Sequence, residues 1–376
     1  MEFSFTVLKK DKNTKARRGI YQTPHGIIQT PVFMPVGTQG TVKALSPKDL
    51  HDNEVQIILN NTYHMYLRPG HKLVESFGGL HKFISWDKPI LTDSGGYQVF
   101  SLSDLNKITE EGVKFKSHID GSYHLFTPEN VMEIETSLGA DIIMAFDECT
   151  PYPATFAYAD QSQKRTTRWA KRCKAKFDEI IDLKGEKKQQ LFGIVQGSIF
   201  TDLRQQSAND IVNINFDGYA IGGLSVGEPK EVMYEMIDVV EPYLPYDKPR
   251  YLMGVGMPED IIEAVKRGVD MFDCVVPTRY GRNGTVFTYN GKVNIRNSKF
   301  KTDKSPIDEN CTCYTCQNFS KGYLRHLVHA GEILGAHLLT LHNIHFFMDF
   351  TKQIRLAIEE DRFLEWANSF YNNFFQ

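Results

Sequence analysis

The runs DIIMAFD (residues 141–147) and LFGIVQ (191–196) decide the fold class, because each is a short apolar segment that ends in a polar residue. Strands of a parallel sheet that is buried on both faces have this pattern. Similar runs recur along the chain between polar turns and helical patterns; together the eight runs span residues 31–36, 56–60, 89–92, 141–147, 191–196, 219–223, 250–255 and 271–276. Eight such alternations predict a closed (β/α)₈ TIM barrel, with an open doubly wound sheet as the alternative.

Three segments extend beyond a minimal barrel. Residues 1–30 alternate apolar and polar side chains and predict an antiparallel hairpin that forms a lid. Residues 112–126 predict a second hairpin, which turns near Asp120-Gly121. Residues 285–320 follow the eighth strand and carry a cluster of cysteines. Because no linker or low-complexity segment divides the chain, we expect one integrated body.

The composition is that of a globular protein in water, with 41% hydrophobic and 24% charged residues. No segment approaches the roughly 20 apolar residues of a membrane span, and the N-terminus lacks the features of a signal peptide. We therefore expect a cytoplasmic protein. The net charge of −3 argues against a general nucleic-acid coat protein, which needs many phosphate contacts, but it leaves room for a local basic patch.

Polar residues and glycines converge where the predicted strands end. The third strand runs into Asp93, the fourth into Asp147, the fifth into Gln196 and the sixth into Gly223, while the eighth contains Asp273. In a barrel of this kind the strands deliver their last residues to one rim, the C-terminal face, where active sites lie. The convergence predicts an active site at that rim.

Asp273 stands out because it interrupts the apolar segment MFDCVV. A carboxylate in such a position is either paired with a buried cation or used in chemistry. Asp93 has a plainer interpretation as a turn residue or helix cap. Together the two residues would supply the carboxylates needed for substitution at the anomeric carbon of a sugar, one to attack and one to manage protons.

The sequence CTCYTC places Cys311, Cys313 and Cys316 within six residues. Three close cysteines followed by histidine predict a tetrahedral zinc site rather than a redox motif. Spacing alone leaves the fourth ligand open among His326, His329, His337, His342 and His345. Because the cluster follows the last strand, we predict one structural Zn²⁺ per chain. Its subdomain, about residues 285–350, is expected to be integrated into a single catalytic barrel domain of residues 1–376.

Long motifs occur in order over nearly the whole chain. They are DSGGYQVFSL (93–102), FDECTPYPA (146–154), FGIVQGS (192–198), DGYAIGGLSVGEP (217–229), RYLMGVGMPED (250–260), MFDCVVPTRYGRNG (271–284), CTCYTC (311–316) and LHNIHFF (341–347). These motifs resemble those of bacterial tRNA-guanine transglycosylases, the queuine tRNA-ribosyltransferase family. The resemblance implies exchange of a guanine at the wobble position of a tRNA anticodon for 7-aminomethyl-7-deazaguanine.

The resemblance also implies a role for each carboxylate. Asp273 corresponds to the nucleophile that attacks the ribose C1′ and forms a covalent RNA–enzyme intermediate. Asp93 corresponds to the general acid/base that protonates the leaving guanine and deprotonates the incoming base. Two successive displacements retain the configuration of the sugar. Among the downstream histidines, His342 matches the fourth zinc ligand of the family.

The predicted base pocket follows from the chemistry of guanine. Its N1 and 2-amino N–H groups want a carboxylate, which Asp147 can supply, and its O6 wants a donor. Gln196 and the backbone N–H of Gly223 can serve that oxygen and the nearby ring edge, because glycine permits close approach. Tyr97 and Met253 resemble the residues that sandwich the flat ring in the family, although core packing is the commoner role of such side chains.

The choice of incoming base rests on the resemblance. Cys149 and Val226 match bacterial members that insert 7-aminomethyl-7-deazaguanine, and we place Leu224 in the same substrate-binding set. Glu228 resembles the residue that helps to recognise the aminomethyl group. Ser225 departs from the alanine that is usual in bacterial members.

The expected partner is the anticodon loop of tRNA, whose single-stranded bases leave their stack at reduced cost. Arg279 and Arg282 resemble the family's contacts to neighbouring uridines, while Tyr280 stands where a small residue is usual. Further candidates for phosphate contacts are Lys292, Arg296, Lys299 and Lys301. The basic run 164–176 predicts an exposed helix face. The resemblance also implies a homodimer.

Two other functions compete with the transglycosylase. A zinc-containing barrel glycoside hydrolase would use the same two carboxylates, but it would give Asp147, Gln196 and Gly223 no reason to match a purine. A noncatalytic tRNA-binding subunit should lack a catalytic aspartate, whereas this chain keeps Asp93 and Asp273.

Overall fold

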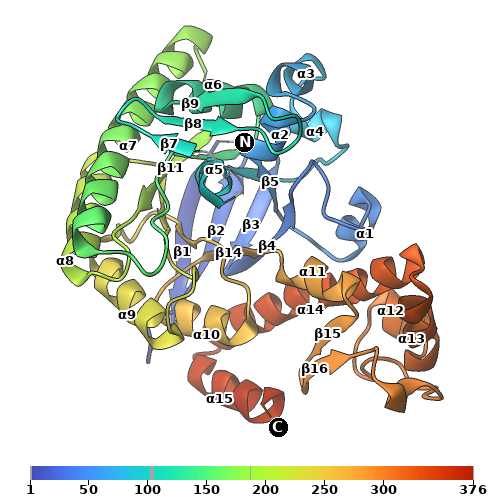
Figure 1. Ribbon diagram of the computed structural model, residues 1–376. Coiled ribbons are helices and arrows are strands. Elements are labelled where there is room, and N and C mark those ends of the chain that lie inside the picture. The colour runs from blue at the N-terminus through green and yellow to red at the C-terminus, as the bar shows by residue number, and fades with distance from the viewer. Residues whose placement is uncertain (1, 102–105, 187, 376) are drawn as a thin grey trace.

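The computed structural model describes residues 2–101, 106–186 and 188–375. Its centre is a closed barrel of eight parallel strands (Figure 1). The strands follow chain order: β4 (Val32–Gly37), β5 (Ile58–Asn61), β6 (Ile90–Asp93), β10 (Ile142–Met144), β11 (Gln190–Val195), β12 (Gly218–Ile221), β13 (Arg250–Leu252) and β14 (Met271–Cys274). Each overlaps a predicted strand, and the pairing of β14 with β4 closes the barrel. The (β/α)₈ prediction is confirmed, and the open-sheet alternative is wrong.

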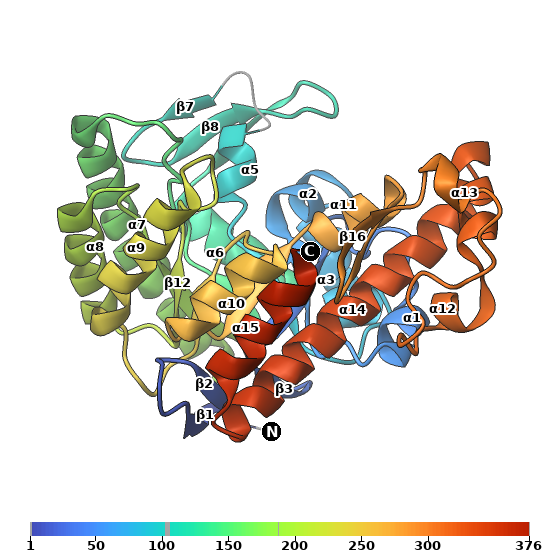
Figure 2. The ribbon, with the colours of Figure 1, turned by 90° about the horizontal axis from the view of Figure 1, so that it is seen from below.

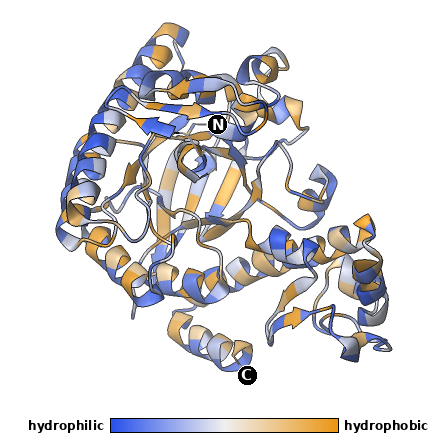
Figure 3. Cartoon of the chain, in the orientation of Figure 1, coloured by the Kyte–Doolittle hydropathy of each residue, from blue (hydrophilic) through white to orange (hydrophobic). Residues whose placement is uncertain are grey.

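Apolar side chains fill the inside of the barrel. On β4, Val32, Met34 and Val36 belong to the inner cluster, whereas Phe33 packs in the outer cluster between strands and helices. Alternation of this kind follows from the two-residue period of a strand. Figure 3 shows the barrel strands as largely hydrophobic and the surrounding helices as banded. The polar residues of the site therefore sit at the strand ends, above a packed core.

The predicted N-terminal hairpin is present as a three-stranded antiparallel sheet, made of β1 (Ser4–Lys10), β2 (Arg17–Thr23) and β3 (Gly26–Thr30). Tyr21 and Ile28 from this sheet join the inner cluster of the barrel. Figure 2 shows the sheet at one end of the barrel, with α5 (Gly96–Ser101) and β7 (Asn106–Ile108) at the other. The sheet therefore covers the end of the barrel at which the strands begin, opposite the rim at which the strands end in polar residues.

The second predicted hairpin is also present, as β8 (Val113–Lys116) and β9 (Tyr123–Phe126). The chain turns at Gly121, whose φ of 77° is a backbone conformation that glycine adopts readily. A third strand, β7, pairs with β8 and was not predicted. Residue 102, the last of the DSGGYQVFSL motif, lies outside the described residues.

Helices cover the outside of the barrel: α1 (Pro47–Asp52), α2 (Thr62–Leu67), α3 (His71–Ser76), α4 (Leu80–Phe83), α6 (Pro128–Leu138), α7 (Phe156–Lys184), α8 (Thr201–Asn213), α9 (Lys230–Val240) and α10 (Pro258–Lys266). The basic run 164–176 lies on α7, where its arginines form ion pairs; one example joins Arg168 to Glu110 at 2.6 Å. Among the described helices, none combines the length and the apolar character needed to cross a bilayer.

The chain after β14 forms a region beside the barrel (Figure 1). It consists of α11 (Val276–Arg282), β15 (Thr285–Thr288), β16 (Gly291–Asn294), α12 (Tyr314–Asn318), α13 (Lys321–Ala330), α14 (Ile333–Glu359) and α15 (Phe363–Phe374). Asn343 of α14 connects three of these elements, because its side chain donates to the Pro277 carbonyl at 2.9 Å and accepts from the Phe287 N–H at 3.0 Å. The long helix α14 is thus fixed to the end of the last barrel strand.

Candidate active site and metal centre

Asp93 and Asp273 lie at the same rim, as predicted. Asp93 is the last residue of β6, and Asp273 is the third of the four residues of β14. Both residues are half-buried. They are close enough for the charge of Asp273 to raise the pKa of Asp93. The structure therefore brings together the two residues that sequence reasoning paired.

Donors from the end of β5, the start of α2 and the turn after β6 surround the carboxylate of Asp93. Oδ1 accepts hydrogen bonds from the backbone N–H groups of Thr62 and Gly95, both at 3.1 Å. Oδ2 accepts from Asn61 Nδ2 at 2.5 Å, which is possible because Asn61 lies beside Asp93 in the β5–β6 register. Burial still dominates, and with the charge of Asp273 it raises the pKa of Asp93 to about 7. Asp93 can therefore hold or release a proton near neutral pH.

Asp273 has an asymmetric environment. Its Oδ1 accepts hydrogen bonds from Tyr251 Oη at 2.6 Å and from the Gly254 N–H at 2.7 Å. Among the described residues, nothing forms a hydrogen bond with its Oδ2. Burial raises the pKa of Asp273, and the bond from Tyr251 opposes that shift. One oxygen is thus held in place while the other is free to react.

Asp147 and Gln196 form a pair within hydrogen-bonding distance. Asp147 accepts from Gln196 Nε2 at 2.7 Å and from Ser94 Oγ at 3.0 Å. Burial raises the pKa of Asp147 to about 6. Gln196 Oε1 is buried and has no partner in the described part of the chain. A Cβ at position 223 would lie 2.2 Å from this oxygen, so Gly223, at a φ of 63°, is needed for the close approach.

Arg204 of α8 is a site residue that sequence reasoning missed. Its guanidinium is fully buried and donates to the carbonyls of Ser198, Val195, Gly222 and Gly223 at 2.7 to 3.1 Å. Burial lowers the pKa of Arg204 to about 10. By tying the ends of β11 and β12 together, the arginine fixes the backbone on which Gln196 and Gly223 stand. A buried arginine without a carboxylate has no signature in the sequence.

The remaining predicted base-contact residues lie on the loops of this rim. Tyr97, on α5, is 55% exposed, and Met253 directly follows β13. Burial raises the pKa of the Cys149 thiol to about 12, so this group is neutral. Leu224 is buried and Val226 is half-buried.

Glu228 binds the backbone of its own loop. Its carboxylate accepts hydrogen bonds from the N–H groups of Ser225 and Val226, the second at 2.9 Å. Ser225 has a φ of 58°, which is a left-handed conformation. Ser225, which stands where bacterial members usually have alanine, therefore lies in the bend that Glu228 stabilises.

Arg279 and Arg282 follow Asp273 on α11. In the described part of the chain, neither guanidinium has a hydrogen bond or an ion pair, and Arg282 Nη1 is buried without a partner. The proximity of Arg279 adds to the effect of burial in lowering the pKa of Arg282. The ring of Tyr280, between these two arginines in the sequence, stacks on Phe287 with centroids 5.6 Å apart.

The structure brings the four predicted metal-ligating side chains together in one cluster. The ligand atoms of Cys311, Cys313, Cys316 and His342 all lie within 4.8 Å of one another. His342 Nδ1 faces the three sulfurs at 3.3 to 3.7 Å, and its Nε2 lies 2.8 Å from the Phe287 carbonyl. That contact fixes the ring so that Nδ1 offers its lone pair, as in metal-bound histidines.

The other downstream histidines contact different groups. His326 stacks on the Tyr323 ring, and His329 lies against the Arg296 carbonyl. His337 lies against the Ala44 carbonyl, and His345 lies against the Asn53 side chain. Of the five histidines left open by spacing, His342 is therefore the one that lies with the three cysteines.

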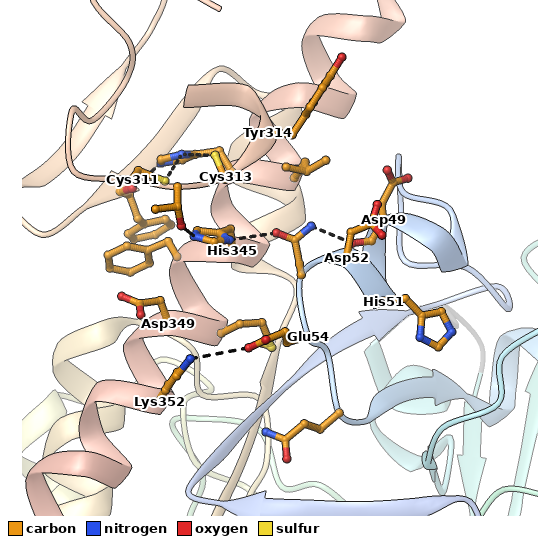
Figure 4. Close-up of a pocket in the computed structure, with 18 of the residues that line it drawn as sticks. Asp49, His51, Asp52, Glu54, Cys311, Cys313, Tyr314, His345, Asp349 and Lys352 are labelled. Atoms are coloured by element: carbon orange, nitrogen blue, oxygen red, sulfur yellow. Dashed lines mark hydrogen bonds and ion pairs between the residues drawn. The ribbon is translucent and has the colours of Figure 1, made fainter. Parts of the chain in front are cut away.

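A groove of about 1340 Å³ lies between the metal cluster and α1 (Figure 4). His345 Nδ1 lies 3.1 Å from Asn53 Oδ1, and Lys352 Nζ lies 3.8 Å from Glu54 Oε2, so polar contacts from α14 reach the barrel here. The groove lining includes neither Asp93 nor Asp273. It is separate from the two-acid site.

The fold and the two rim carboxylates define a (β/α)₈ barrel enzyme with an appended metal-binding cluster. The family model described as "Queuine tRNA-ribosyltransferase" matches residues 11–376. A queuine tRNA-ribosyltransferase of Caldanaerobacter subterraneus subsp. tengcongensis is 60% identical over 371 residues, covering 99% of this chain and 97% of the relative. One of Desulforamulus reducens is 57% identical over 374 residues, covering 100% and 99%. The chain belongs to the queuine tRNA-ribosyltransferase family.

Proposed function

We propose that this chain is a tRNA-guanine transglycosylase that replaces the wobble guanine of a tRNA anticodon with 7-aminomethyl-7-deazaguanine. The family membership supports the reaction class and leaves the glycoside hydrolase alternative without support. The observation that carries the mechanism is the asymmetry of Asp273. Its Oδ1 is held by two donors and its Oδ2 has no hydrogen bond among the described residues, while its charge acts on Asp93 at the same rim. A noncatalytic tRNA-binding subunit has no use for such a pair.

In the first step, Asp273 Oδ2 attacks the ribose C1′ as the bond from C1′ to guanine N9 breaks. Tyr251 and the Gly254 N–H orient the carboxylate through Oδ1. Asp93, whose pKa of about 7 keeps it partly protonated, gives its proton to the departing guanine. The products are an ester between Asp273 and the RNA, free guanine and an ionised Asp93.

In the second step, the incoming base occupies the place that guanine left. The Asp93 carboxylate removes the proton from N9 of the base, and N9 attacks C1′ and displaces Asp273. Both acids return to their starting states. Two inversions at C1′ give net retention.

Asp147 and Gln196 select the base. An ionised carboxylate offers about four acceptor positions, and the hydrogen bonds from Ser94 and Gln196 use two. The remaining two match the N1 and 2-amino N–H groups of guanine. Adenine would present an acceptor to this buried carboxylate, which strongly disfavours it. Leu224, Val226, Cys149 and Glu228 would then border the side of the ring that carries the aminomethyl group.

We propose Zn²⁺ as the metal of the Cys₃His cluster, because three thiolates and one imidazole suit its tetrahedral preference. Four protein ligands leave no open position, so the ion would stabilise the region after β14 and take no part in the reaction. Cys313→Ser should lose the metal and unfold this region. Metal analysis of the purified variant and its thermal unfolding test this; full metal content would contradict the assignment.

We also propose the domain organisation, the location and the oligomeric state of the chain. The chain forms one catalytic domain with the metal-binding subdomain integrated into it, which the Asn343 contacts support. It acts in the cytoplasm, and it forms a homodimer. Analytical ultracentrifugation at micromolar concentration tests the dimer.

The decisive experiment uses labelled guanine and unmodified tRNA. Base exchange should place the label in the anticodon loop, and denaturing electrophoresis should reveal a covalent RNA–protein adduct during turnover. Mass spectrometry of that adduct should map the attachment to Asp273. Attachment at another residue would overturn the mechanism, and failure to incorporate label would overturn the function.

A further inference from the structure

Three side chains from separate elements meet at the N-terminal end of the barrel, opposite the two-acid site. His25 lies in the turn between β2 and β3, His81 lies on α4, and Asp141 directly precedes β10. His25 Nδ1 is 2.7 Å from Asp141 Oδ1, and His81 Nε2 is 3.1 Å from Asp141 Oδ2. The three ligand atoms lie within 4.8 Å of one another.

The two imidazoles are arranged alike. Their rings stack with centroids 3.6 Å apart and planes 14° apart, and both direct a nitrogen at the same carboxylate. Because an imidazole binds a metal in the plane of its ring, the more exposed His25 ring must turn out of this stack to share one ion with His81. Ligands about 2.1 Å from a metal, at ordinary coordination angles, lie about 3 to 3.5 Å from each other. The contact from His81 to Asp141 already has that length, and the contact from His25 needs to open by less than about 1 Å.

We propose that His25, His81 and Asp141 form a second metal site, which binds a divalent transition ion of the Zn²⁺, Co²⁺ or Ni²⁺ class. Two neutral imidazoles and one carboxylate are the ligands that these ions accept, and three protein ligands leave positions for water. A single cation could be coordinated by both imidazoles and by the carboxylate. Two protonated imidazoles stacked at 3.6 Å would instead repel each other.

The exposure of the cluster suits this role. The side chain of Asp141 is buried. The side chains of His25 and His81 are 39% and 11% exposed, so solvent reaches the cluster from the His25 side.

The position of the site indicates a structural function. His25 belongs to the sheet that closes the barrel, whereas Asp141 also accepts the Ile90 N–H at 2.9 Å and so anchors two barrel strands. An ion here would cross-link the N-terminal sheet to α4 and to the start of β10. We expect binding to slow local opening of residues 17–30 and to leave the chemistry at the other end unchanged.

The test uses the full-length, untagged protein with its Cys₃His cluster loaded with zinc. Equilibrium dialysis against micromolar Zn²⁺ should give a second bound equivalent for the wild type, and hydrogen exchange of residues 17–30 should slow. His25→Ala should lose the second equivalent and the slowing, with at least about a tenfold loss of affinity. His25 lies in an exposed turn, so this variant should fold.

Two further variants make the result decisive. His81→Gln keeps a hydrogen-bond donor for Asp141 but removes a metal ligand, so it should also lose the second equivalent. The matched control is His51→Ala, which removes a histidine that faces a single carboxylate, Asp87, at 3.0 Å. The control should bind as the wild type does. The proposal would be overturned if the wild type bound only one equivalent of Zn²⁺, or if His25→Ala or His81→Gln still bound two. Loss of the second equivalent in His51→Ala would also overturn it. The three side chains would then form only a hydrogen-bonded cluster.

Discussion

The carboxylates at the N-terminal end of the barrel and the three acids of the candidate active site have opposite kinds of partners. At the N-terminal end, Asp270 lies against the Arg17 guanidinium, with contacts of 2.9 and 2.5 Å, and Asp141 lies between two histidines. At the C-terminal end, Asp93, Asp147 and Asp273 have neutral donors and no cation at hydrogen-bonding distance among the described residues.

The pKa values reflect this difference. Partners hold the pKa of Asp141 at about 2, whereas burial raises the pKa of Asp93 to about 7 and that of Asp147 to about 6. A buried acid with a cation is a structural element, since its charge is neutralised. A buried acid with only neutral partners stores free energy that a reaction or a ligand can use. The following variants test this contrast.

The largest effect is expected for Asp273→Asn. The variant keeps the shape of the side chain but removes the attacking oxygen, so guanine exchange should fall by at least about 10⁴-fold. Its melting temperature should stay the same or rise, because a half-buried charge without a cationic partner disappears. Exchange kinetics and thermal unfolding measured on the same preparation check both statements. A variant that retains exchange would remove Asp273 as the nucleophile.

The matched change at the other end is Asp270→Asn. It leaves the Arg17 guanidinium buried, 1% exposed, without its counter-charge, which should cost about 3 to 5 kcal/mol of unfolding free energy. Exchange per folded molecule should stay close to that of the wild type. Urea unfolding with activity measured well below the midpoint separates the two quantities. A stable variant with lost exchange would contradict the structural role of this end.

The pH dependence of exchange should also follow the C-terminal carboxylates. Below about pH 6, Asp147 becomes neutral and cannot accept both N–H groups of guanine. Above about pH 7, Asp93 loses the proton that the leaving base needs. The value of kcat/KM should therefore peak between these limits and fall by up to about tenfold per pH unit outside them. A profile that is flat from pH 5.5 to 8.5 would show that neither group controls the rate.

Much of the fold could be predicted from the sequence, because the features that define it are local. Strands buried on both faces are apolar runs, and parallel strands of a barrel end at one rim. The positions of Asp93, Asp147 and Asp273 relative to those runs were therefore enough to place them together. The CTCYTC motif was equally direct, since its ligands are local.

Contacts between elements were not accessible in this way. Asn61 reaches Asp93 through strand register, and Tyr251 donates to Asp273 from the neighbouring strand, so neither contact leaves a local pattern. The same is true of His25, which lies 116 residues before Asp141. The strand β7 was missed because NKI is too short and too polar to stand out.

The smallest expected effect concerns the cations rather than the carboxylates. Arg279 on α11 has no partner in the described part of the chain, whereas Arg168 on α7 is paired with Glu110 at 2.6 Å. If the unpaired cation contacts a phosphate, Arg279→Ala should weaken tRNA binding by about fivefold at 0.15 M salt and lower the slope of log K against log salt by about one. Arg168→Ala, the matched control, should change neither quantity, because its charge is already neutralised. Filter binding over a range of salt concentrations measures both variants. Equal slopes of log K against log salt for the wild type and Arg279→Ala would show that an unpaired arginine at this rim does not mark an RNA contact. The contrast between paired and unpaired groups would then hold for the acids alone.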